Sequence, residues 1–576
     1  MRRVPLLLTL LPVLFACEHE GPPGAPGGGT VSLPVQDEDA PVRALYLCAN
    51  RFVLINAHPF PVRVTWRVQG TEEQGEQLLA GAPDGDPGLF ETELTVLHQG
   101  SLELYRDDRL LAVRANEQTP CEPTTGASLA VASSGTAGSW SAPAPWPIVA
   151  IHLHLLRTGK VLAWGRDGHP YVYDVGTGSF ASAPVGTSNI FCSGHAFLPD
   201  GRLLVAGGHI SDNHGIADGH LFNPATQAWS STASMRDGRW YPTVTELANG
   251  QVLTIAGKNE DAKPVTVPEV WSSGSWRALT GASRSLPYYP RQFLAPNGRI
   301  FYAGELKTTS YLNTAGSGSW STVGDRRYGV RDYGAAVMYL PGKILYAGGG
   351  RTTATAETID LNQASPSWKW TGSMAYPRRH LNATMLPTGE VLVTSGTRAT
   401  SFDDPSLAVH VAEIWNPATG AWRKVASNSV NRSYHSTSLL LPDGRVLHAG
   451  SGGATFPDGS PEPDQKNAEL YSPPYLFAGA RPTISTAPGS VAYGSTFSVS
   501  TASASSIGKV SFIALGSVTH AFDMNQRFLW LTFSRTSGGL SVQAPASRNT
   551  APPGYYMLFI LNSNGVPSKA KIVKLG

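Results

Sequence analysis

Phenol, imidazole and thiol side chains recur at one position of a repeated pattern in this chain. The pattern is an apolar run, a tight turn with glycine and a second apolar run, as in SYHSTSLLLPDGRVLHAG. Nine residues before the turn glycine stand Cys192 in one copy, Tyr241 in the next and His435, preceded by Tyr434, in a later copy. Imidazole nitrogen and phenolate oxygen together suit Cu(II), which lies at the top of the divalent affinity order. In the simpler interpretation these side chains bond to one another and cap a channel.

Seven copies of the pattern follow one another, with turn glycines 42 to 55 residues apart. Two apolar strands around a tight turn at such a period are typical of kelch-type propeller blades. The innermost strand of a blade lines the central channel, so the residues nine positions before each glycine open onto one face. Tyr289, Tyr333 and His380 share this register, either as packing residues, which is the simpler interpretation, or as neighbours of a metal. The turn glycines are Gly159, Gly201, Gly250, Gly298, Gly342, Gly389 and Gly444.

An aromatic residue marks the outer strand of most copies, but the seventh copy lacks its tryptophan. A lone strand-like segment with Trp140 precedes the first copy, and we expect it to complete the seventh blade and close the ring. Closure removes the exposed sheet edges that an open array would leave. The sequence therefore predicts a seven-bladed kelch-type β-propeller over residues 135–475.

Two further β domains flank the predicted propeller, so the fold class is all-β. Residues 480–576 lose the repeat and contain short strand-like runs between Gly, Ser and Pro turns, which predicts an Ig-like (early-set) β-sandwich. Residues 41–125 predict a small N-terminal β-sandwich. Cys48 and Cys121 bracket its strands, and in an exported protein we expect them to form a disulfide.

The N-terminus is typical of an export signal. MRRVPLLLTLLPVLFAC has two arginines and an apolar run too short to span a bilayer. Cys17 directly after this run resembles the lipidated cysteine of a bacterial lipoprotein. We therefore expect residues 1–17 to be a signal segment and residues 18–40 to be a flexible tether at the cell envelope. Secretion without a lipid anchor is the alternative.

Composition limits the partners of the protein. Charged residues make up 15% of the chain, the formal net charge is +2, and no basic run suggests nucleic acid. No glycine-rich nucleotide loop follows a strand. We expect a monomer that acts on small molecules and touches a membrane only through its lipid anchor.

From about residue 130 to its C-terminus the chain resembles the galactose oxidase and glyoxal oxidase family of copper radical oxidases, as a bacterial member. The segments IFCSGH, GRWYPT, SYHSTSLLLPDGRV and GSVTHAFDMNQR carry the resemblance. It implies that Tyr241, Tyr434, His435 and His520 bind a copper ion. It also implies that Cys192, otherwise interpreted as a buried free thiol, joins Tyr241 through a thioether and that this pair carries a radical.

The implied activity is oxidation of small aldehydes or primary alcohols, with O2 reduced to H2O2. In the mechanism that the resemblance implies, Tyr434 receives the substrate proton and the Cys192–Tyr241 pair takes a hydrogen atom from the substrate carbon. One alternative is a non-catalytic propeller that binds carbohydrate or protein at the cell surface. A purely structural surface protein is another.

One departure concerns the ring that covers the radical. Galactose oxidase has a tryptophan just past the strand that follows the equatorial tyrosine, whereas this sequence has Asn259 there, with no tryptophan near it. Candidates for the substrate pocket are Arg239, Trp240, Arg327 and Arg331, each of which would otherwise be a structural residue.

A histidine-rich segment, GGHISDNHGIADGHLF, offers a second hypothesis. It contains His209, His214 and His220 with two aspartates, which suggests another metal site. Polar loops are expected between the strands of a blade, and we favour the loop interpretation.

Overall fold

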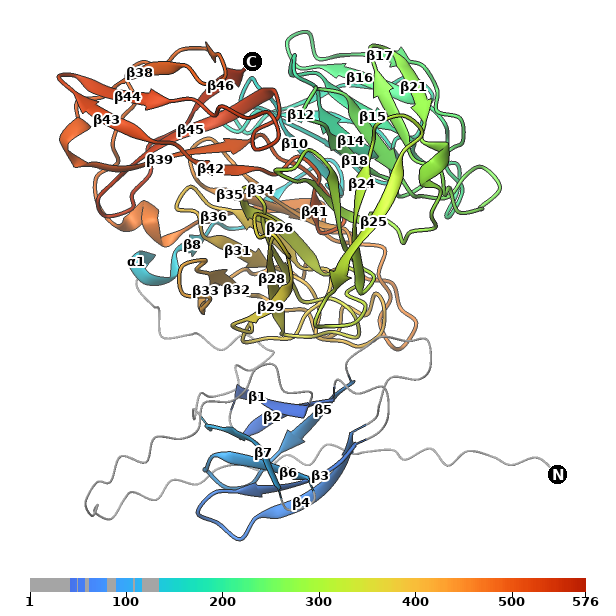
Figure 1. Cartoon of the computed structure of the whole chain (residues 1–576), viewed down its shortest axis with the longest axis vertical. Helices are drawn as coiled ribbons and strands as arrows, with labels where there is room; N and C mark the ends of the chain where they lie inside the picture. The colour runs from blue at the N-terminus through green and yellow to red at the C-terminus, as the bar shows by residue number, and fades with distance from the viewer. Residues whose placement is uncertain (1–41, 49, 57–61, 80–89, 107–108, 117–133) are drawn as a thin grey trace.

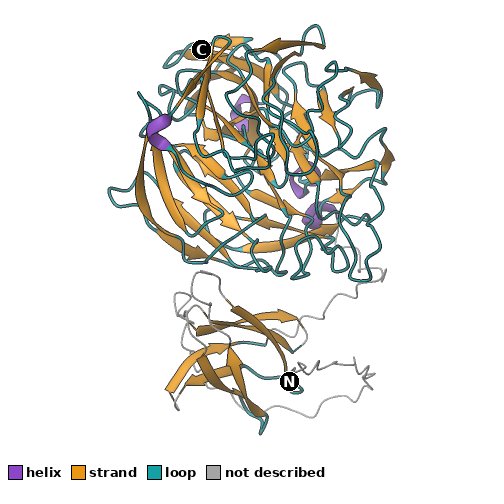
Figure 2. Ribbon diagram, turned by 90° about the vertical axis from the view of Figure 1, so that its right-hand side faces the viewer, coloured by secondary structure: helices purple, strands orange, loops and turns teal. Residues whose placement is uncertain are grey.

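The computed structural model of the chain describes residues 42–48, 50–56, 62–79, 90–106, 109–116 and 134–576. Strands make up most of its regular structure (Figure 2). Its helical elements are single turns: α1 (Ser134–Ala137), η1 (Thr280–Ala282), η2 (Pro474–Phe477) and η3 (Ala504–Ser506). In the part of the chain that is described, no helix is long and apolar enough to cross a membrane.

The N-terminal strands form two sheets around a hydrophobic core of their own (Figure 1). One sheet has the order β1-β2-β5 and the other β4-β3-β6-β7. Cys48 ends β1, but Cys121 lies outside the described residues, as do Cys17 and the expected signal and tether. The disulfide and the lipid anchor therefore stay predictions. The strands are β1 (Val42–Cys48), β2 (Arg51–Asn56), β3 (Val62–Val68), β4 (Gln74–Leu79), β5 (Phe90–Thr95), β6 (Leu102–Arg106) and β7 (Arg109–Arg114).

Each of the seven repeats forms one antiparallel sheet. All seven turn glycines have φ between 76° and 85°, the left-handed conformation that this tight turn needs and that glycine adopts without strain. The strands of blades one to three are β10 (His152–Leu155), β11 (Val161–Trp164), β12 (Tyr171–Tyr173), β13 (Phe180–Ser182); β14 (Gly194–Phe197), β15 (Leu203–Ala206), β16 (Gly219–Asn223), β17 (Ala228–Thr232); β18 (Thr243–Glu246), β19 (Val252–Ile255), β20 (Glu269–Ser272) and β21 (Ser275–Ala278).

Blades four to six follow the same order from the channel outwards, and blade seven takes its outer strand from the N-terminal side of the repeats. Their strands are β22 (Arg291–Leu294), β23 (Ile300–Gly304), β24 (Thr308–Asn313), β25 (Ser319–Asp325); β26 (Ala335–Leu340), β27 (Lys343–Ala347), β28 (Ala356–Asp360), β29 (Trp368–Thr371); β30 (Asn382–Met385), β31 (Val391–Thr394), β32 (Val411–Trp415), β33 (Trp422–Ser427); β34 (Ser436–Leu440), β35 (Val446–Gly450), β36 (Asn467–Ser472) and β8 (Ser139–Trp140).

The ring closes as the sequence predicts. Strand β8 pairs with β36, so that Trp140 lies opposite Tyr471, and β9 (Ala144–Pro145) pairs with the same strand. The Trp140 indole N–H donates to the carbonyl of Ala426 in blade six at 2.7 Å. The innermost strands of blades seven and one, β34 and β10, lie side by side.

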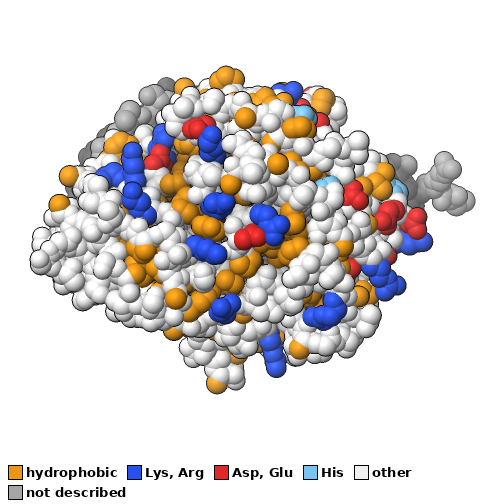
Figure 3. Space-filling model, turned by 90° about the horizontal axis from the view of Figure 1, so that it is seen from above, with side chains coloured by type: hydrophobic (Ala, Val, Ile, Leu, Met, Phe, Trp, Pro, Cys, Tyr) orange, Lys and Arg blue, Asp and Glu red, His pale blue; other side chains and the backbone are white. Residues whose placement is uncertain are grey.

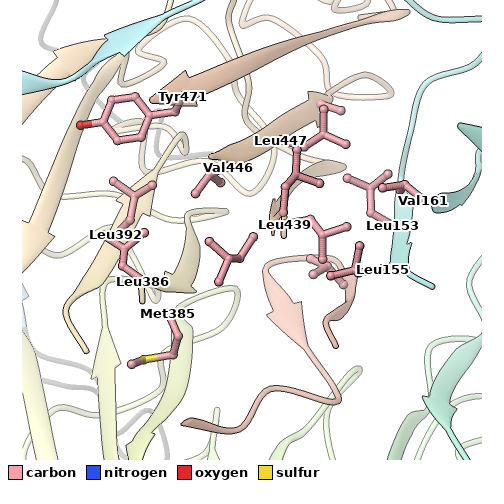
Figure 4. Close-up of a cluster of buried hydrophobic side chains, with 14 of the residues drawn as sticks. Leu153, Leu155, Val161, Met385, Leu386, Leu392, Leu439, Val446, Leu447 and Tyr471 are labelled. Atoms are coloured by element: carbon pink, nitrogen blue, oxygen red, sulfur yellow. The ribbon is translucent and has the colours of Figure 1, made fainter. Parts of the chain in front are cut away.

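Aliphatic side chains of neighbouring blades pack against one another to form the propeller core. Figure 4 shows one such region, where Leu153 and Val161 of blade one approach Leu439 and Leu447 of blade seven, and Leu392 of blade six lies beyond them. Inner strands are covered on both faces, which explains their continuous apolar runs. Each fully buried leucine or valine contributes about 1.5–3 kcal/mol relative to an exposed one.

The C-terminal residues form a β-sandwich with its own core and send one hairpin into the propeller. The sheets have the orders β37-β46-β45-β39-β42 and β38-β44-β43. The hairpin, β40 (Ser517–Thr519) and β41 (Phe522–Asp523), instead pairs with β10 and extends the sheet of blade one. The other strands are β37 (Ser490–Val491), β38 (Thr496–Ser500), β39 (Ile507–Ala514), β42 (Phe528–Trp530), β43 (Phe533–Thr536), β44 (Gly539–Gln543), β45 (Gly554–Asn562) and β46 (Lys571–Leu575).

The surface carries few charges, as the composition suggests. On the face drawn in Figure 3, acidic and basic side chains are interspersed among uncharged surface, and apolar side chains lie between them.

Four blades share a buried arginine–glutamate pair that anchors the segment before the channel residue. In blade six, Arg378 donates to Glu413 at 2.6 Å, and the second carboxylate oxygen accepts from the N–H of Ala375. Both side chains are at most 1% exposed. The equivalent pairs in blades three, five and seven are Arg239–Glu269, Arg331–Glu357 and Arg432–Glu469.

We predict that Glu413→Gln destabilises the propeller, because it leaves the Arg378 guanidinium buried without its counter-charge. Breaking such a pair costs about 3–5 kcal/mol, so the unfolding temperature should fall clearly. The control is Arg423→Gln, which breaks the more exposed Arg423–Glu390 pair and should cost at most about 1 kcal/mol. Equal unfolding temperatures for the two variants would contradict this role.

Candidate functional site

Six of the seven blades present their register residue with the same unusual backbone conformation. Non-glycine residues rarely adopt positive φ, because Cβ then crowds the backbone. Because the six residues share this conformation, their side chains leave the backbone in the same direction at the mouth of the channel. The positions counted back from the turn glycines are therefore structurally equivalent. The residues are Cys192 (φ 62°), Tyr241 (65°), Tyr289 (44°), Tyr333 (50°), His380 (58°) and His435 (64°).

The C-terminal hairpin brings a seventh side chain to the same place. His520 follows β40 directly and also has positive φ, 45°. Pairing of β40 with β10 carries it into the channel, where its ring centroid lies 4.5 Å from that of Tyr241 and 4.8 Å from that of His435. His520 is 2% exposed.

Three donor atoms converge on a fourth, the phenol oxygen of Tyr241. Its Oη lies 2.7 Å from Tyr434 Oη, 2.9 Å from His520 Nε2 and 3.5 Å from His435 Nε2. Tyr241, His435 and His520 are each at most 4% exposed. The structure thus brings together all four residues that the family resemblance implies as metal ligands.

Second hydrogen bonds fix which imidazole nitrogens carry lone pairs. His435 Nδ1 lies 2.7 Å from the carbonyl of Gly452, which can only accept, so the proton is on Nδ1. His520 Nδ1 lies 2.6 Å from Thr519 Oγ1, whose hydroxyl donates to the carbonyl of Ile151. Both Nε2 atoms therefore direct a lone pair at the Tyr241 oxygen, as in histidines that bind metals.

Burial keeps the whole set uncharged. It lowers the pKa of His435 to about 3 and that of His520 well below its usual range, in the latter case with help from His435. It raises the pKa of both phenols, Tyr241 and Tyr434. Two neutral imidazoles and two phenols form a donor set without charge, and a divalent cation that displaced the phenol protons would be neutralised by them.

Cys192 lies beside Tyr241 on the neighbouring blade. It is a buried free thiol, and the N–H of Tyr241 donates to its carbonyl at 2.8 Å. Burial raises the pKa of the thiol, while hydrogen bonding to the Tyr241 side chain acts in the opposite direction. The side chains of Cys192 and Tyr241 thus interact directly.

A tryptophan does cover Tyr241, in contrast to the expectation from Asn259. The indole of Trp240 stacks on the Tyr241 ring with a centroid distance of 3.8 Å and an interplanar angle of 4°. Its N–H donates to His209 Nδ1 at 3.1 Å. The residue directly before the tyrosine therefore supplies the stacking ring, which counting forward along the sequence to Asn259 overlooks.

Two of the arginines considered for the substrate pocket are structural. Arg239 and Arg331 are fully buried, and their guanidinium groups bind the glutamates and carbonyls of their own blades. Neither side chain has surface exposed to a substrate. Arg327 is exposed, and its backbone N–H donates to Glu357. Trp240 is placed over Tyr241, where it covers the ring.

The histidine-rich segment does not gather around one point. His214 Nδ1 bonds to the carbonyl of Glu260 at 2.8 Å, and His209 bonds to Trp240. His220 lies in β16, with Nε2 3.9 Å from Asp218. Among the described residues, no group of three or more His, Cys, Asp and Glu side chains is arranged to hold a metal ion.

Three rings lie next to Tyr434, of which sequence reasoning named Tyr333 and His380 but missed Phe402. The ring of Phe402 lies 5.4 Å from that of Tyr434 and is 42% exposed, while His380 and Tyr333 lie 5.1 and 5.8 Å away. Phe191 meets His435 edge-on at 5.7 Å. Phe402 lies in a loop between two strands of blade six, and nothing in the repeat marks it.

An open pocket of about 220 Å³ reaches the opposite edge of the site. It lies between blades one and seven and is lined by His435, Arg166, Gly453 and Lys466, among others. A small molecule can therefore reach the His435 ring from the surface, while Tyr241, Tyr434 and His520 do not line this pocket.

Comparisons with known proteins agree with this geometry. The family model described as "Glyoxal oxidase N-terminus" matches residues 347–475, and the one described as "Galactose oxidase-like, Early set domain" matches residues 481–575. A protein named galactose oxidase from Gibberella zeae is 30% identical over 552 residues, which cover 86% of this chain and 80% of that protein. The chain belongs to the galactose oxidase and glyoxal oxidase family.

Other members of this galactose oxidase and glyoxal oxidase family carry different names. The aldehyde oxidase GLOX of Vitis pseudoreticulata is 30% identical over 475 residues, 72% of this chain and 87% of that protein. A solved structure described as a novel fungal alcohol oxidase in complex with copper has a TM-score of 0.70 and 25% identity, and covers 76% of this chain and 100% of its own.

We predict that His435 and His520 stay neutral, with the proton on Nδ1, as the pH falls from 8 to about 4. Burial lowers both pKa values, so the charged form gains population only as the pH approaches about 3 for His435. Imidazole ¹⁵N spectra of the metal-free protein, assigned with His435→Asn and His520→Asn, test this against free histidine. A proton on Nε2, or protonation near pH 6, would contradict it.

Proposed function

We propose that the protein is a copper radical oxidase that oxidises small aldehydes or primary alcohols and reduces O2 to H2O2. The observation that carries this proposal is the convergence of Tyr434, His435 and His520 on Tyr241, with the Cys192 thiol beside it. The family relationship supports oxidase chemistry, and its named members include a galactose oxidase and an aldehyde oxidase.

The donor set fits copper. Two imidazole nitrogens and two phenol oxygens are ligands that Cu(II) prefers, and both Nε2 lone pairs already face the common point. Gly452 and Thr519 hold the rings in that orientation, which is the supporting role that outer partners of metal-bound histidines take. When bound, a copper ion would accept one electron and increase the acidity of a coordinated substrate oxygen.

The protein side chains supply the rest of the reaction. Tyr434 is placed to take the substrate proton, because its phenol lies between Tyr241 and the partly exposed ring of Phe402. Tyr241, oxidised and bonded to the Cys192 sulfur, takes the hydrogen atom from the substrate carbon. The substrate thus loses two protons and two electrons, and O2 gains them to give H2O2.

The surroundings of Tyr241 suit a protein-based radical. Trp240 covers one face of its ring, and Tyr289 packs beside it with a centroid distance of 4.7 Å. These two rings cover the Tyr241 ring and exclude water from it. A one-electron oxidised Tyr241 is therefore shielded from reductants in solution. The modest pocket at His435 supports small substrates, and an aldehyde would enter as its hydrate.

We further propose that the protein is a bacterial one, exported and anchored through a lipid on Cys17. Support comes from the N-terminal sequence alone, with its arginines, short apolar run and cysteine. The mass of the mature N-terminal peptide tests the lipid. A carbohydrate-binding propeller without activity remains the competing function, since both would sit at the cell surface.

The direct test is peroxide formation by copper-loaded protein supplied with O2 and small aldehydes or primary alcohols. We expect peroxide and the matching acid or aldehyde in equal amounts, because each turnover moves two electrons. Cys192→Ser should retain copper and the fold but lose turnover, since it cannot form the thioether. Glycan binding without peroxide from the wild-type protein would favour the competing function.

We also predict that Trp240→Leu shortens the lifetime of the oxidised protein. Leucine keeps the site apolar but removes the ring stacked at 3.8 Å, so solvent and reductants reach Tyr241. Trp240→Phe retains a stacked ring and should decay more slowly than Trp240→Leu. The decay of the radical absorption after chemical oxidation measures this, with Trp276→Leu on the outer strand of blade three as control. Equal lifetimes for wild type and Trp240→Leu would contradict the shielding role.

A further inference from the structure

Backbone hydrogen bonds connect the left-handed register residues in three of the five neighbouring pairs of blades. The N–H of Tyr241 donates to the carbonyl of Cys192 at 2.8 Å, and the N–H of Tyr289 donates to that of Tyr241 at 3.0 Å. In the same way the N–H of His380 donates to the carbonyl of Tyr333 at 2.9 Å. Each bond ties a strained residue to its equivalent on the preceding blade.

Cys192 begins this series and has no such carbonyl before it. Nine residues before its turn glycine, blade one has Ala150, which is not among the residues with positive φ. A side chain takes the place of the missing carbonyl: the N–H of Cys192 donates to Nε2 of His152 at 3.3 Å. The His152 side chain is thus the hydrogen-bond acceptor for the backbone N–H of Cys192.

His152 is itself oriented by a chain of hydrogen bonds. Its Nδ1 lies 3.1 Å from Nε2 of His195, and His195 Nδ1 lies 2.6 Å from Ser517 Oγ. Ser517 Oγ lies 2.9 Å from Nδ1 of His154. All four side chains are fully buried, and they come from blade one, blade two and the C-terminal hairpin.

The direction of this chain follows from its first donor. Burial lowers the pKa of His152, His154 and His195, so the imidazoles are neutral and each has one donor and one acceptor nitrogen. Because Cys192 N–H must donate, His152 accepts on Nε2 and donates from Nδ1. His195 then donates to Ser517, and Ser517 donates to His154. One arrangement of protons satisfies every link.

Packing leaves His152 no freedom to turn. Its ring stacks on the indole of Trp164 at 4.8 Å and 15°, and His154 stacks on the same indole at 4.4 Å and 24°. Buried imidazoles need partners for both nitrogens, and an apolar residue would fill this space without that requirement. At the far end of the chain, His154 Nε2 has no partner among the described residues, whereas the end at Cys192 is satisfied.

We propose that His152 is a positioning residue that holds the left-handed backbone of Cys192 and thereby aims its thiol at Tyr241 for cross-link formation. This inference rests on the proposed function. In the cross-linking step the S–H bond of Cys192 and one ring C–H bond of Tyr241 break, and an S–C bond forms. The two protons and two electrons released pass to O2, which becomes H2O2 with copper present.

The first test measures the backbone bond without copper. In metal-free protein, the amide of Cys192 should exchange with deuterium about tenfold faster in His152→Leu than in the wild type, because it loses its acceptor. His152→Gln offers a carbonyl at similar reach and should restore protection. The control is His448→Leu, which removes another fully buried histidine, bonded to Thr437 and Ser438 in blade seven.

The second test follows cross-linking after aerobic addition of copper, as the loss of two hydrogens from the joined peptides. His152→Leu should cross-link about tenfold more slowly than wild type, while His152→Gln and His448→Leu stay within about twofold. If His152→Leu does not fold, His152→Asn, whose amide is too short to reach, replaces it in both measurements.

The outcomes separate this inference from the function on which it rests. Unchanged amide exchange and cross-linking in His152→Leu, or equal behaviour of His152→Asn and His152→Gln, would overturn the role of His152. No cross-link in the wild type would overturn the proposed function, while the exchange measurement would still decide whether His152 holds the Cys192 backbone.

Discussion

The site depends on the pairing of one C-terminal hairpin with the innermost strand of blade one. Through the bonds between β40 and β10, His520 enters the channel among side chains that the propeller blades provide. Its Nε2 then lies 2.9 Å from the phenol oxygen of Tyr241, which blade three provides. Blade seven provides the other two residues of the set, Tyr434 and His435. Without that pairing the propeller would present two phenols and one imidazole, and Cys192 would lose the support of Ser517 through His195.

The repeat provides the other half of the geometry. A kelch blade ends its approach to the channel with one left-handed residue, and six blades use it to turn a side chain into the same space. In four blades a buried arginine–glutamate pair holds the segment just before that residue. Selection at the site therefore needs only to change the side chain at a position that six of the blades already orient. Cysteine, tyrosine and histidine at this position make the centre, while Tyr289, Tyr333 and His380 pack around it.

The sequence predicts most of the fold and the composition of the site, for physical reasons that differ between residues. Turn glycines and apolar runs repeat with the blade, so the register that groups Cys192, Tyr241 and His435 can be counted. His520 lies outside the repeat, and only the family resemblance points to it. Strand pairing between distant segments decides its position, and no local pattern encodes that. The presence of Asn259 led to the expectation that no tryptophan covers Tyr241, and this was wrong. Stacking depends on the direction of the ring, and the ring of Trp240, the residue directly before Tyr241, lies over it.

The roles of the charged residues were also not predictable from the sequence alone. Arg239 and Arg331 look like pocket residues in the sequence because they precede the channel positions by two residues. Their partners, Glu269 and Glu357, lie on the third strands of the blades, and burial of each pair removes the arginine from the site. The role of His152 is equally hidden, since it follows from a hydrogen bond to the Cys192 backbone that no local sequence pattern marks.

The central claim is that Cys192 and Tyr241 are placed to become one redox centre beside a copper ion. Peptide mass spectrometry of the wild-type protein, after copper loading in air, tests it most directly. We expect the peptides that contain Cys192 and Tyr241 to appear joined and lighter by two hydrogens than their sum. Copper bound at the site with both peptides remaining separate would contradict the account.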